Sequence, residues 1–506
     1  MTAISTVQPQ VKISSQMVLR FAIGVALSAL SGVMLLLAFP PYGIWPLAWV
    51  ALIPALFAQY RLLPQRLSSL ASSLYILFWL GPFFARYFEN LFGPFFTYLG
   101  VLIALLGLFL SIERKFHELT GFRWFVIYGM FNWVGIEMIR ATFIPHIGIG
   151  AFIGLTQATQ AWLFQPVSFF SIYGFNFVIL LVNYALALGV LAWYDRKYPF
   201  TTVRVDTRLS KRWLAVTGLI LVVWIGLSLV LLSSTPKDSP TVRVAALRPG
   251  YVLPAFNDEV NTRQVRLEAF ASQARQAAAQ GAQVLVTPEM MFDFDPRQQF
   301  TEEFKAIARE TNTYIFIAYA VVDPLPFRNE IILLSPSGEF SEAYAKNHPM
   351  PGEPLSPDAG RFPVFDTPFG KMAAMICHDV DFMDVARKLA ANGAQLIALG
   401  LWEYRGAAEQ QWTNATFNAV QSNTAIVVTG TTYFSAIIDQ KGHQVELDIR
   451  REPSPLVMVG DVVMGSGHTI YSAIGDVLGW FALVGLAFFT TFMFVIRLRA
   501  WKAARK

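Results

Sequence analysis

The second half of this chain is organised around the stretch Lys371-Met-Ala-Ala-Met-Ile-Cys377-His378-Asp379, which carries the only cysteine in 506 residues. The short apolar run before the cysteine has no helix cap, and it predicts a buried strand that ends at the thiol. Residues 381–391 then predict a helix, which Asn392-Gly393 terminates. At a strand-to-helix junction, backbone N–H groups and the helix dipole favour a thiolate. The alternative is a cysteine that serves as a small buried hydrophobe.

The composition indicates a membrane protein. The sequence is 55% hydrophobic and 14% charged, with a formal net charge of +5. Soluble domains are rarely so apolar, so we expect membrane spans. Basic loops beside such spans explain the positive charge better than nucleic acid does, and no nucleic-acid partner is expected. One cysteine and six scattered histidines give no ligand spacing for a metal, and no cofactor motif is present in the sequence.

Apolar segments separated by short polar ones predict eight spans, at residues 18–38, 46–60, 68–85, 92–112, 123–140, 163–193, 213–232 and 475–496. No small-residue cleavage site follows the first apolar run, so we interpret it as a retained span rather than a signal peptide. The expected organisation is therefore a short N-terminus at 1–17, a seven-helix membrane domain at 18–232, an exported domain at 233–472, and an eighth helix with a basic tail at 473–506.

The basic residues also predict the orientation. With eight spans, all five clusters of lysine and arginine in the loops and termini fall on one side of the membrane. By the positive-inside rule this side is the cytoplasm, which places both termini there and residues 233–472 outside. Within the spans, Glu137 and Arg140 are three residues apart on one helical face. This spacing favours an ion pair between helices, and a contact with lipid headgroups is the alternative.

The exported segment alternates short apolar strands with helices. Strands are expected at 242–247, 284–287, 314–322, 330–334, 371–377, 396–399, 425–429 and 435–439, with helices at 258–280, 302–310, 381–391 and 407–421. Residues 279–286 (AQGAQVLV) also resemble residues 391–398 (ANGAQLIA), because in both a helix ends at glycine and a buried strand begins. Two such halves would form an α/β αββα sandwich, with helices outside two sheets.

Three side chains suited to acyl transfer are expected at strand ends. Glu289 ends a buried strand, where a carboxylate without a partner is costly. Lys346 directly follows a strand, and Cys377 ends another. Each has a structural explanation when taken alone, as a helix-start carboxylate, a solvated lysine or a core thiol. Together they form a nucleophilic site, in which the carboxylate takes the thiol proton and the ammonium stabilises an oxyanion.

The order Glu289, Lys346, Cys377 resembles the nitrilase superfamily, and the flanking spans narrow the resemblance to apolipoprotein N-acyltransferases. The likeness covers nearly the whole chain and includes Phe39-Pro-Pro-Tyr-Gly, Asn132-Trp-Val-Gly-Ile-Glu-Met-Ile-Arg140, Tyr173-Gly-Phe-Asn176 and Tyr471-Ser-Ala-Ile-Gly-Asp-Val-Leu-Gly-Trp480. It implies a bacterial inner-membrane enzyme whose cysteine is acylated by a phospholipid. The acyl chain would then pass to the α-amine of the diacylglyceryl-cysteine of an apolipoprotein. A monomer is the simplest expectation.

The resemblance also implies individual roles. Glu289 would be the general base, Lys346 would stabilise the oxyanion, and Glu353 would be a second glutamate that supports the site. His378 and Asp379 stand where the family usually has an aromatic residue and glutamate, and both are candidates for support. A Cys377–His378 pair is disfavoured, because neighbouring strand residues face opposite ways. Three aromatic residues are expected either in loops at the membrane interface or in the core, namely Trp402, Tyr404 and Trp412.

Two alternatives to the transferase remain open. Asn418 and Gln421 stand where the family has arginine and glutamate, which motivates a non-catalytic scaffold. Retention of all three catalytic residues argues against a scaffold. A membrane-tethered amidohydrolase of nitrilase type would use water as the acceptor. The many spans argue against it, because a hydrolase of soluble amides needs only one anchor.

Overall fold

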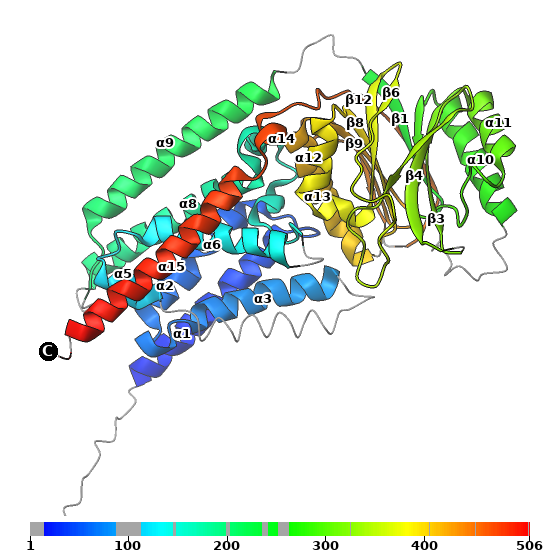
Figure 1. The fold of residues 1–506 in the computed structure, drawn as a ribbon. Helices are drawn as coiled ribbons and strands as arrows, with labels where there is room; N and C mark the ends of the chain where they lie inside the picture. The colour runs from blue at the N-terminus through cyan, green and yellow to red at the C-terminus, as the bar shows by residue number, and fades with distance from the viewer. Residues whose placement is uncertain are drawn as a thin grey trace, which may run out of the picture.

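The computed structural model describes residues 15–87, 113–144, 148–198, 203–234, 241–250, 263–323, 325–403, 405–450, 452–503 and 505. Membrane-type helices form one half of the molecule, and a two-sheet α/β domain forms the other (Figure 1). The last long helix, α15 (Val477–Ala503), returns from the α/β domain to the helical half. This confirms the predicted fold class of helical membrane domain and nitrilase-like sandwich.

Five helical stretches in the described part of the chain are long and apolar enough to cross a membrane, namely Ser15–Ala38 (α1), Gln65–Tyr87 (ending in α3, Leu70–Tyr87), Val167–Lys197 (α8), Thr207–Leu232 (α9) and α15. α6 (Phe125–Phe143) packs against α8 and α15. α5 (Glu113–Leu119) lies before α6, and α7 (Ala161–Phe164) before α8. The expected span at 92–112 lies outside the described residues.

The segment expected to span the membrane at 46–60 is not one long helix. It consists of a 3-10 turn at Trp45–Trp49, α2 (Ile53–Phe57) and a π-type turn at Ala58–Leu62. Proline lies at the start of the first two pieces, where its missing N–H is tolerated but prevents a continuous helix. The buried Arg61 at the end of the segment pairs with Asp195 of α8 at 2.6 Å. The prediction of one continuous helix at 46–60 was therefore wrong, because prolines interrupt this apolar run.

Glu137 and Arg140 do not form the expected ion pair among the described residues. Glu137 accepts hydrogen bonds from Trp133 and Asn176, at 3.0 and 2.7 Å. The Arg140 guanidinium lies over the ring of Phe152 instead, 5.2 Å from its centroid. The buried carboxylate is thus satisfied by neutral donors, which removes the need for a charged partner.

The α/β domain contains two six-stranded sheets, ordered β12-β1-β2-β3-β4-β5 and β11-β10-β9-β8-β7-β6. The strands of the first are β1 (Thr241–Arg248), β2 (Val284–Val286), β3 (Tyr314–Val321), β4 (Arg328–Leu334), β5 (Phe340–Ala345) and β12 (Leu456–Val463). Those of the second are β6 (Phe365–Thr367), β7 (Gly370–Ile376), β8 (Leu396–Leu401), β9 (Ala425–Gly430), β10 (Phe434–Ile438) and β11 (Gln444–Ile449). Strands β6, β11 and β12 were not predicted from the sequence, and β5 was expected only as a strand directly before Lys346, without bounds.

The two sheets have the same topology. In each, two parallel crossovers are followed by two antiparallel hairpins: β1, β2, β3, β4, β5 in one and β7, β8, β9, β10, β11 in the other. The crossover helices are α10 (Arg263–Ala279) and α11 (Thr301–Thr311) in the first half, and α12 (Met383–Ala391) and α13 (Arg405–Ser422) in the second. The weak sequence similarity between residues 279–286 and 391–398 therefore reflects a structural repeat.

The two helical layers have different surroundings. α10 and α11 form the outer face, remote from the membrane-type helices (Figure 1). α12 and α13 lie between the second sheet and the helical half, and α13 packs against both α3 and α8. Arg86, near the end of α3, forms a bidentate pair with Glu409 of α13 at 2.5 and 2.9 Å. The second sheet and the cysteine at its strand end are therefore fixed directly to the membrane-type helices.

Candidate active site

Cys377 lies where β7 ends and a 3-10 turn begins, at Cys377–Asp381. Its φ is +45°, a left-handed conformation that a residue with a side chain adopts only at a cost of about 1–3 kcal/mol. The residue is buried, and its Sγ lies 3.8 Å from the carbonyl oxygen of Trp402. The strained turn thus places the thiol at the end of β7, where it is buried at the margin of the main hydrophobic core. α12 begins six residues later, slightly later than the sequence predicted.

Two charged side chains, Lys346 and Glu289, lie near the thiol, and a third, Glu353, contacts the lysine. Lys346, directly after β5, places its Nζ 2.8 Å from Glu289 Oε1 and 2.7 Å from Glu353 Oε2. Glu289 follows β2, and the thiol is close enough to interact with both Glu289 and Lys346. Lys346 and Glu289 are almost completely buried, at 3% and 1% exposure. The structure therefore brings together all four residues to which the sequence assigned the main catalytic and supporting roles.

Two further groups in this site were not predicted from the sequence. The Asn329 amide of β4 donates to Glu289 and to Glu353, at 2.7 and 2.8 Å. The Trp402 N–H donates to the other oxygen of Glu289 at 2.9 Å. Both carboxylates are thus fixed in orientation. A polar residue inside a buried strand was a sequence signal for Asn329, whereas a backbone N–H carries no signal.

Burial determines the protonation state of the Cys377 thiol. Burial raises the pKa of Cys377, the nearby Glu289 carboxylate raises it further, and the Lys346 ammonium only partly opposes them. The expectation that the junction favours a thiolate was therefore wrong. Burial also disfavours the Lys346 ammonium, but the negative charges of Glu289 and Glu353 outweigh it and raise the lysine pKa. The site holds a neutral thiol beside a permanently charged lysine.

Asp379 connects the segments that carry the lysine and the cysteine. Its carboxylate accepts the Tyr344 hydroxyl at 2.6 Å and the N–H groups of Asn347, His348 and Ile376 at 2.8 to 3.1 Å. Burial raises its pKa to about 6, although these donors oppose the shift. Asp379, which stands where the family usually has glutamate, therefore connects the end of β5 to the end of β7 through its hydrogen bonds.

The other candidate residues have varied surroundings. His378 is buried, with its ring edge against Phe382 and its Nε2 3.9 Å from Asp381. Trp402 is 41% exposed beside the thiol. Trp412 lies in α13, 5% exposed, which agrees with the core alternative. Tyr404 lies outside the described residues.

The two positions that depart from the family pattern have structural partners. The Asn418 amide donates to the Val380 carbonyl at 2.9 Å, within the turn that follows Cys377. Gln421 accepts the Ile172 N–H at 2.6 Å. This N–H lies beside the kink of α8 at Ser171, whose φ is 54°. Each neutral side chain thus makes a hydrogen bond, while the second polar atom of each, Asn418 Oδ1 and Gln421 Nε2, is buried without a partner among the described residues.

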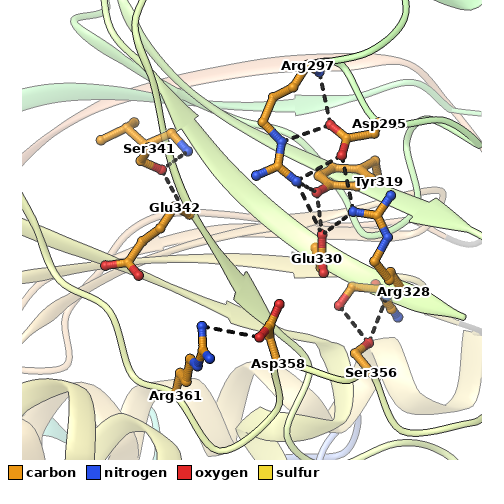
Figure 2. A network of polar contacts seen from close by, with 12 residues as sticks. Asp295, Arg297, Tyr319, Arg328, Glu330, Ser341, Glu342, Ser356, Asp358 and Arg361 are labelled. Atoms are coloured by element: carbon orange, nitrogen blue, oxygen red, sulfur yellow. Dashed lines mark hydrogen bonds and ion pairs between the residues drawn. The ribbon is translucent and has the colours of Figure 1, made fainter. Parts of the chain in front are cut away.

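Figure 2 shows a second polar cluster, which includes Arg328 and Glu330, the neighbours of Asn329 in β4. Because neighbouring strand residues face opposite ways, this cluster lies on the other face of β4 from Asn329. We call it the arginine network, and it consists of Asp295, Arg297, Tyr319, Arg328 and Glu330. Asp295 pairs with Arg297 at 2.8 Å and with Arg328 at 3.1 Å, and the Tyr319 hydroxyl donates to Glu330. Burial tends to raise the pKa of Asp295, but its arginine partners outweigh this and lower it.

Comparisons with known proteins agree with this architecture. A family model described as carbon-nitrogen hydrolase matches residues 243–452, and one described as the apolipoprotein N-acyltransferase N-terminal domain matches residues 31–185. The apolipoprotein N-acyltransferase of Geobacter metallireducens is 26% identical over 91% of this chain and 93% of its own length. That of Thermotoga maritima is 22% identical over 96% of each. A nitrilase-superfamily amidase structure from Nesterenkonia has a TM-score of 0.38 at 19% identity, over 49% of this chain and 95% of its own.

The α/β sandwich with its glutamate, lysine and cysteine defines a protein of the carbon-nitrogen hydrolase class. The match of the membrane half to a second family model, and relatives that match over more than nine-tenths of the chain, define the class more narrowly. The chain belongs to the apolipoprotein N-acyltransferase family, and it is a membrane-embedded acyltransferase.

Proposed function

We propose that this protein transfers an acyl chain from a membrane phospholipid, through a thioester at Cys377, to the N-terminal amine of a diacylated apolipoprotein. The observation that carries the proposal is the buried cluster of Glu289, Lys346 and Cys377, placed at the junction with the membrane-type helices. Soluble nitrilases need no such junction, whereas a lipid substrate does.

In the first half-reaction, Cys377 Sγ attacks the ester carbonyl of the phospholipid as its proton moves to Glu289. A neutral buried thiol requires such a base, because little thiolate exists beforehand. Negative charge develops on the carbonyl oxygen, and the Lys346 ammonium stabilises it. The intermediate collapses to a thioester, and the departing lysophospholipid oxygen takes the proton from Glu289.

In the second half-reaction, the α-amine of the apolipoprotein attacks the thioester. Glu289 accepts a proton from the amine, and Lys346 again stabilises the oxyanion. The C–S bond breaks, the sulfur regains a proton, and the acyl chain remains on nitrogen as an amide. Glu353 keeps Lys346 in place through both steps and Asn329 keeps Glu289 in place, since each pair is in direct contact.

We place the protein in a bacterial inner membrane, with both termini cytoplasmic and the α/β domain on the periplasmic side. The basic tail after α15 and the basic residues around the start of α9 support this orientation. A diacylated apolipoprotein in the outer leaflet would then reach Cys377 from the bilayer.

The acceptor decides between transferase and hydrolase. Purified protein in detergent would receive a phospholipid with a labelled acyl chain and a short diacylglyceryl-cysteinyl peptide. We expect the label on the peptide as an amide that resists hydroxylamine. Label released only as free fatty acid would establish the hydrolase instead, and label that never leaves the phospholipid would favour the scaffold.

A further inference from the structure

A second feature at the domain junction is a cleft of about 410 Å³. The turn after α1 and residues 155–159 form its membrane-side walls, and the start of α13 and the end of β11 form the other side. The apolar part of its lining includes Leu155, Trp412 and Ile449. The cleft therefore joins the helical half and the α/β domain and has both apolar and charged walls.

Positive charge is in excess around this cleft, which we call the arginine cleft. Arg86 pairs with Glu409, as described above. Arg450 pairs with Asp448, but that carboxylate also binds the buried Arg248 at 2.5 Å. Together with Arg405, the guanidinium groups of Arg86, Arg248 and Arg450 thus outnumber the carboxylates of Glu409 and Asp448 by four to two.

Arg405 is the third arginine that lines this cleft. Within the described part of the chain, its side chain makes no hydrogen bond or ion pair, and it is exposed toward the cleft. It is also the first residue of the 18-residue helix α13, whose opening N–H groups add positive potential. Gly406 fixes this helix start against α3, because a Cβ there would lie 1.8 Å from the Arg86 carbonyl oxygen.

The cleft lies at the level where lipid headgroups are expected. α1 and α3, both long and apolar enough to cross a membrane, end beside it at Ala38 and Tyr87. Exposed Tyr42 lies in the adjoining turn, with the Arg86 guanidinium 5.6 Å from its ring centroid. Aromatic residues and arginines at the end of a span are typical of the membrane surface.

The cleft is also close to the catalytic loop. Arg405 follows Trp402 by three residues, so their Cα atoms are at most about 11 Å apart. The Trp402 backbone contacts both Glu289 and Cys377. A molecule held at Arg405 therefore lies within one loop of the nucleophile.

We propose that the arginine cleft binds the phosphodiester of the acyl-donor phospholipid and directs its ester carbonyl toward Cys377; this inference rests on the proposed function. Guanidinium groups recognise phosphate oxygens through charge-assisted hydrogen bonds. Of the two substrates only the donor carries a phosphodiester, since the acceptor's lipid is a glyceryl thioether. The apolar wall of Leu155, Trp412 and Ile449 accommodates the glycerol and the first carbons of the chains.

The test compares two acyl donors in the same detergent micelles: a phospholipid and a p-nitrophenyl ester of the same fatty acid, which has no phosphate. Thioester formation at Cys377 is measured for wild type, Arg405→Gln and Arg405→Lys. Arg275→Gln is the matched control, because Arg275 is an exposed arginine on the outer helix α10. We expect Arg405→Gln to lower kcat/KM for the phospholipid about tenfold, mainly through KM, with partial recovery in Arg405→Lys. The rate with the ester should not change.

Equal loss with both donors, or no loss with the phospholipid, would overturn the assignment. A loss confined to the second half-reaction would assign the cleft to the acceptor instead. If wild type forms a thioester with neither donor, the proposed function itself fails, and this inference fails with it. If wild type reacts with both donors and Arg405→Gln behaves identically, only the inference fails.

Discussion

The catalytic cluster and the arginine network occupy opposite faces of one strand, β4. Asn329 contacts the catalytic carboxylates, while its neighbours Arg328 and Glu330 belong to the network (Figure 2). In the network, two arginines balance two carboxylates. In the catalytic cluster, one lysine serves two carboxylates beside a neutral thiol. We therefore expect the balanced cluster to stabilise the fold and the unbalanced one to provide the carboxylate that accepts a proton.

Removing the Cys377 thiol should abolish catalysis while leaving stability almost unchanged. Cys377→Ala and Cys377→Ser are expected to abolish acyl transfer, a loss of at least about 10³-fold, because no other nucleophile is in place. The melting temperature in detergent should change by only a few degrees, because the thiol contributes little packing. Transfer assays and thermal scans of the same preparations check both statements. Wild-type turnover by either variant would remove Cys377 from its role.

Removing the lysine should impair both chemistry and stability. Lys346→Met leaves Glu289 and Glu353 buried without their shared cation. We expect thioester formation to slow about 10²- to 10³-fold, the usual effect of losing an oxyanion stabiliser. Raising the pH should not restore it, because the charge itself is required. Rapid-quench measurement of the thioester tests this, and normal accumulation would refute the oxyanion role.

Breaking the arginine network should affect stability alone. Asp295→Ala leaves Arg297 and Arg328 with only the Glu330 carboxylate to share in the network, and it is expected to cost about 2–4 kcal/mol, less than a fully buried pair because both arginines reach solvent. The kcat should stay within about twofold, because the network faces away from Cys377. Glu342→Ala, at an exposed position of β5, is the control and should alter neither. A large fall in kcat for Asp295→Ala would mean that the two faces of β4 are coupled.

The smallest effect concerns pH. Asp379 has a pKa of about 6 in the folded protein, above the usual 3.8, so the folded state binds more protons than the unfolded state between these values. Stability contributed by this group is therefore lost as pH rises from about 4 to 6, by at most about 1.4 kcal/mol per pH unit. The difference in melting temperature between wild type and Asp379→Asn should change across this window. A constant difference would contradict the assigned pKa.

Sequence patterns predicted the central elements of the fold because these elements are buried on both faces. β2, β8 and β9 are continuous apolar runs, and α11 and α12 have one apolar face. β11 carries exposed polar residues and lies at a sheet edge, so its sequence resembles a loop, whereas β12, also at an edge, is an apolar run that the sequence prediction missed. Apolar content likewise predicted a span at 46–60, where the prolines instead impose short turns.

The catalytic site was predictable where its chemistry belongs to side chains at strand ends. Glu289, Lys346 and Cys377 were identified because each follows a recognisable strand. The Trp402 N–H could not be identified, because every residue except proline has one. The raised thiol pKa also depends on burial by distant segments, which no local pattern encodes.

Intact mass spectrometry can detect the thioester at Cys377. Purified wild type and Cys377→Ala would be weighed before and after incubation with a defined phospholipid. We expect wild type to gain the mass of one acyl chain, hydroxylamine to remove this mass, and the variant to gain nothing. An unchanged wild-type mass with every phospholipid tried, or an adduct that persists in Cys377→Ala, would contradict the thioester at Cys377.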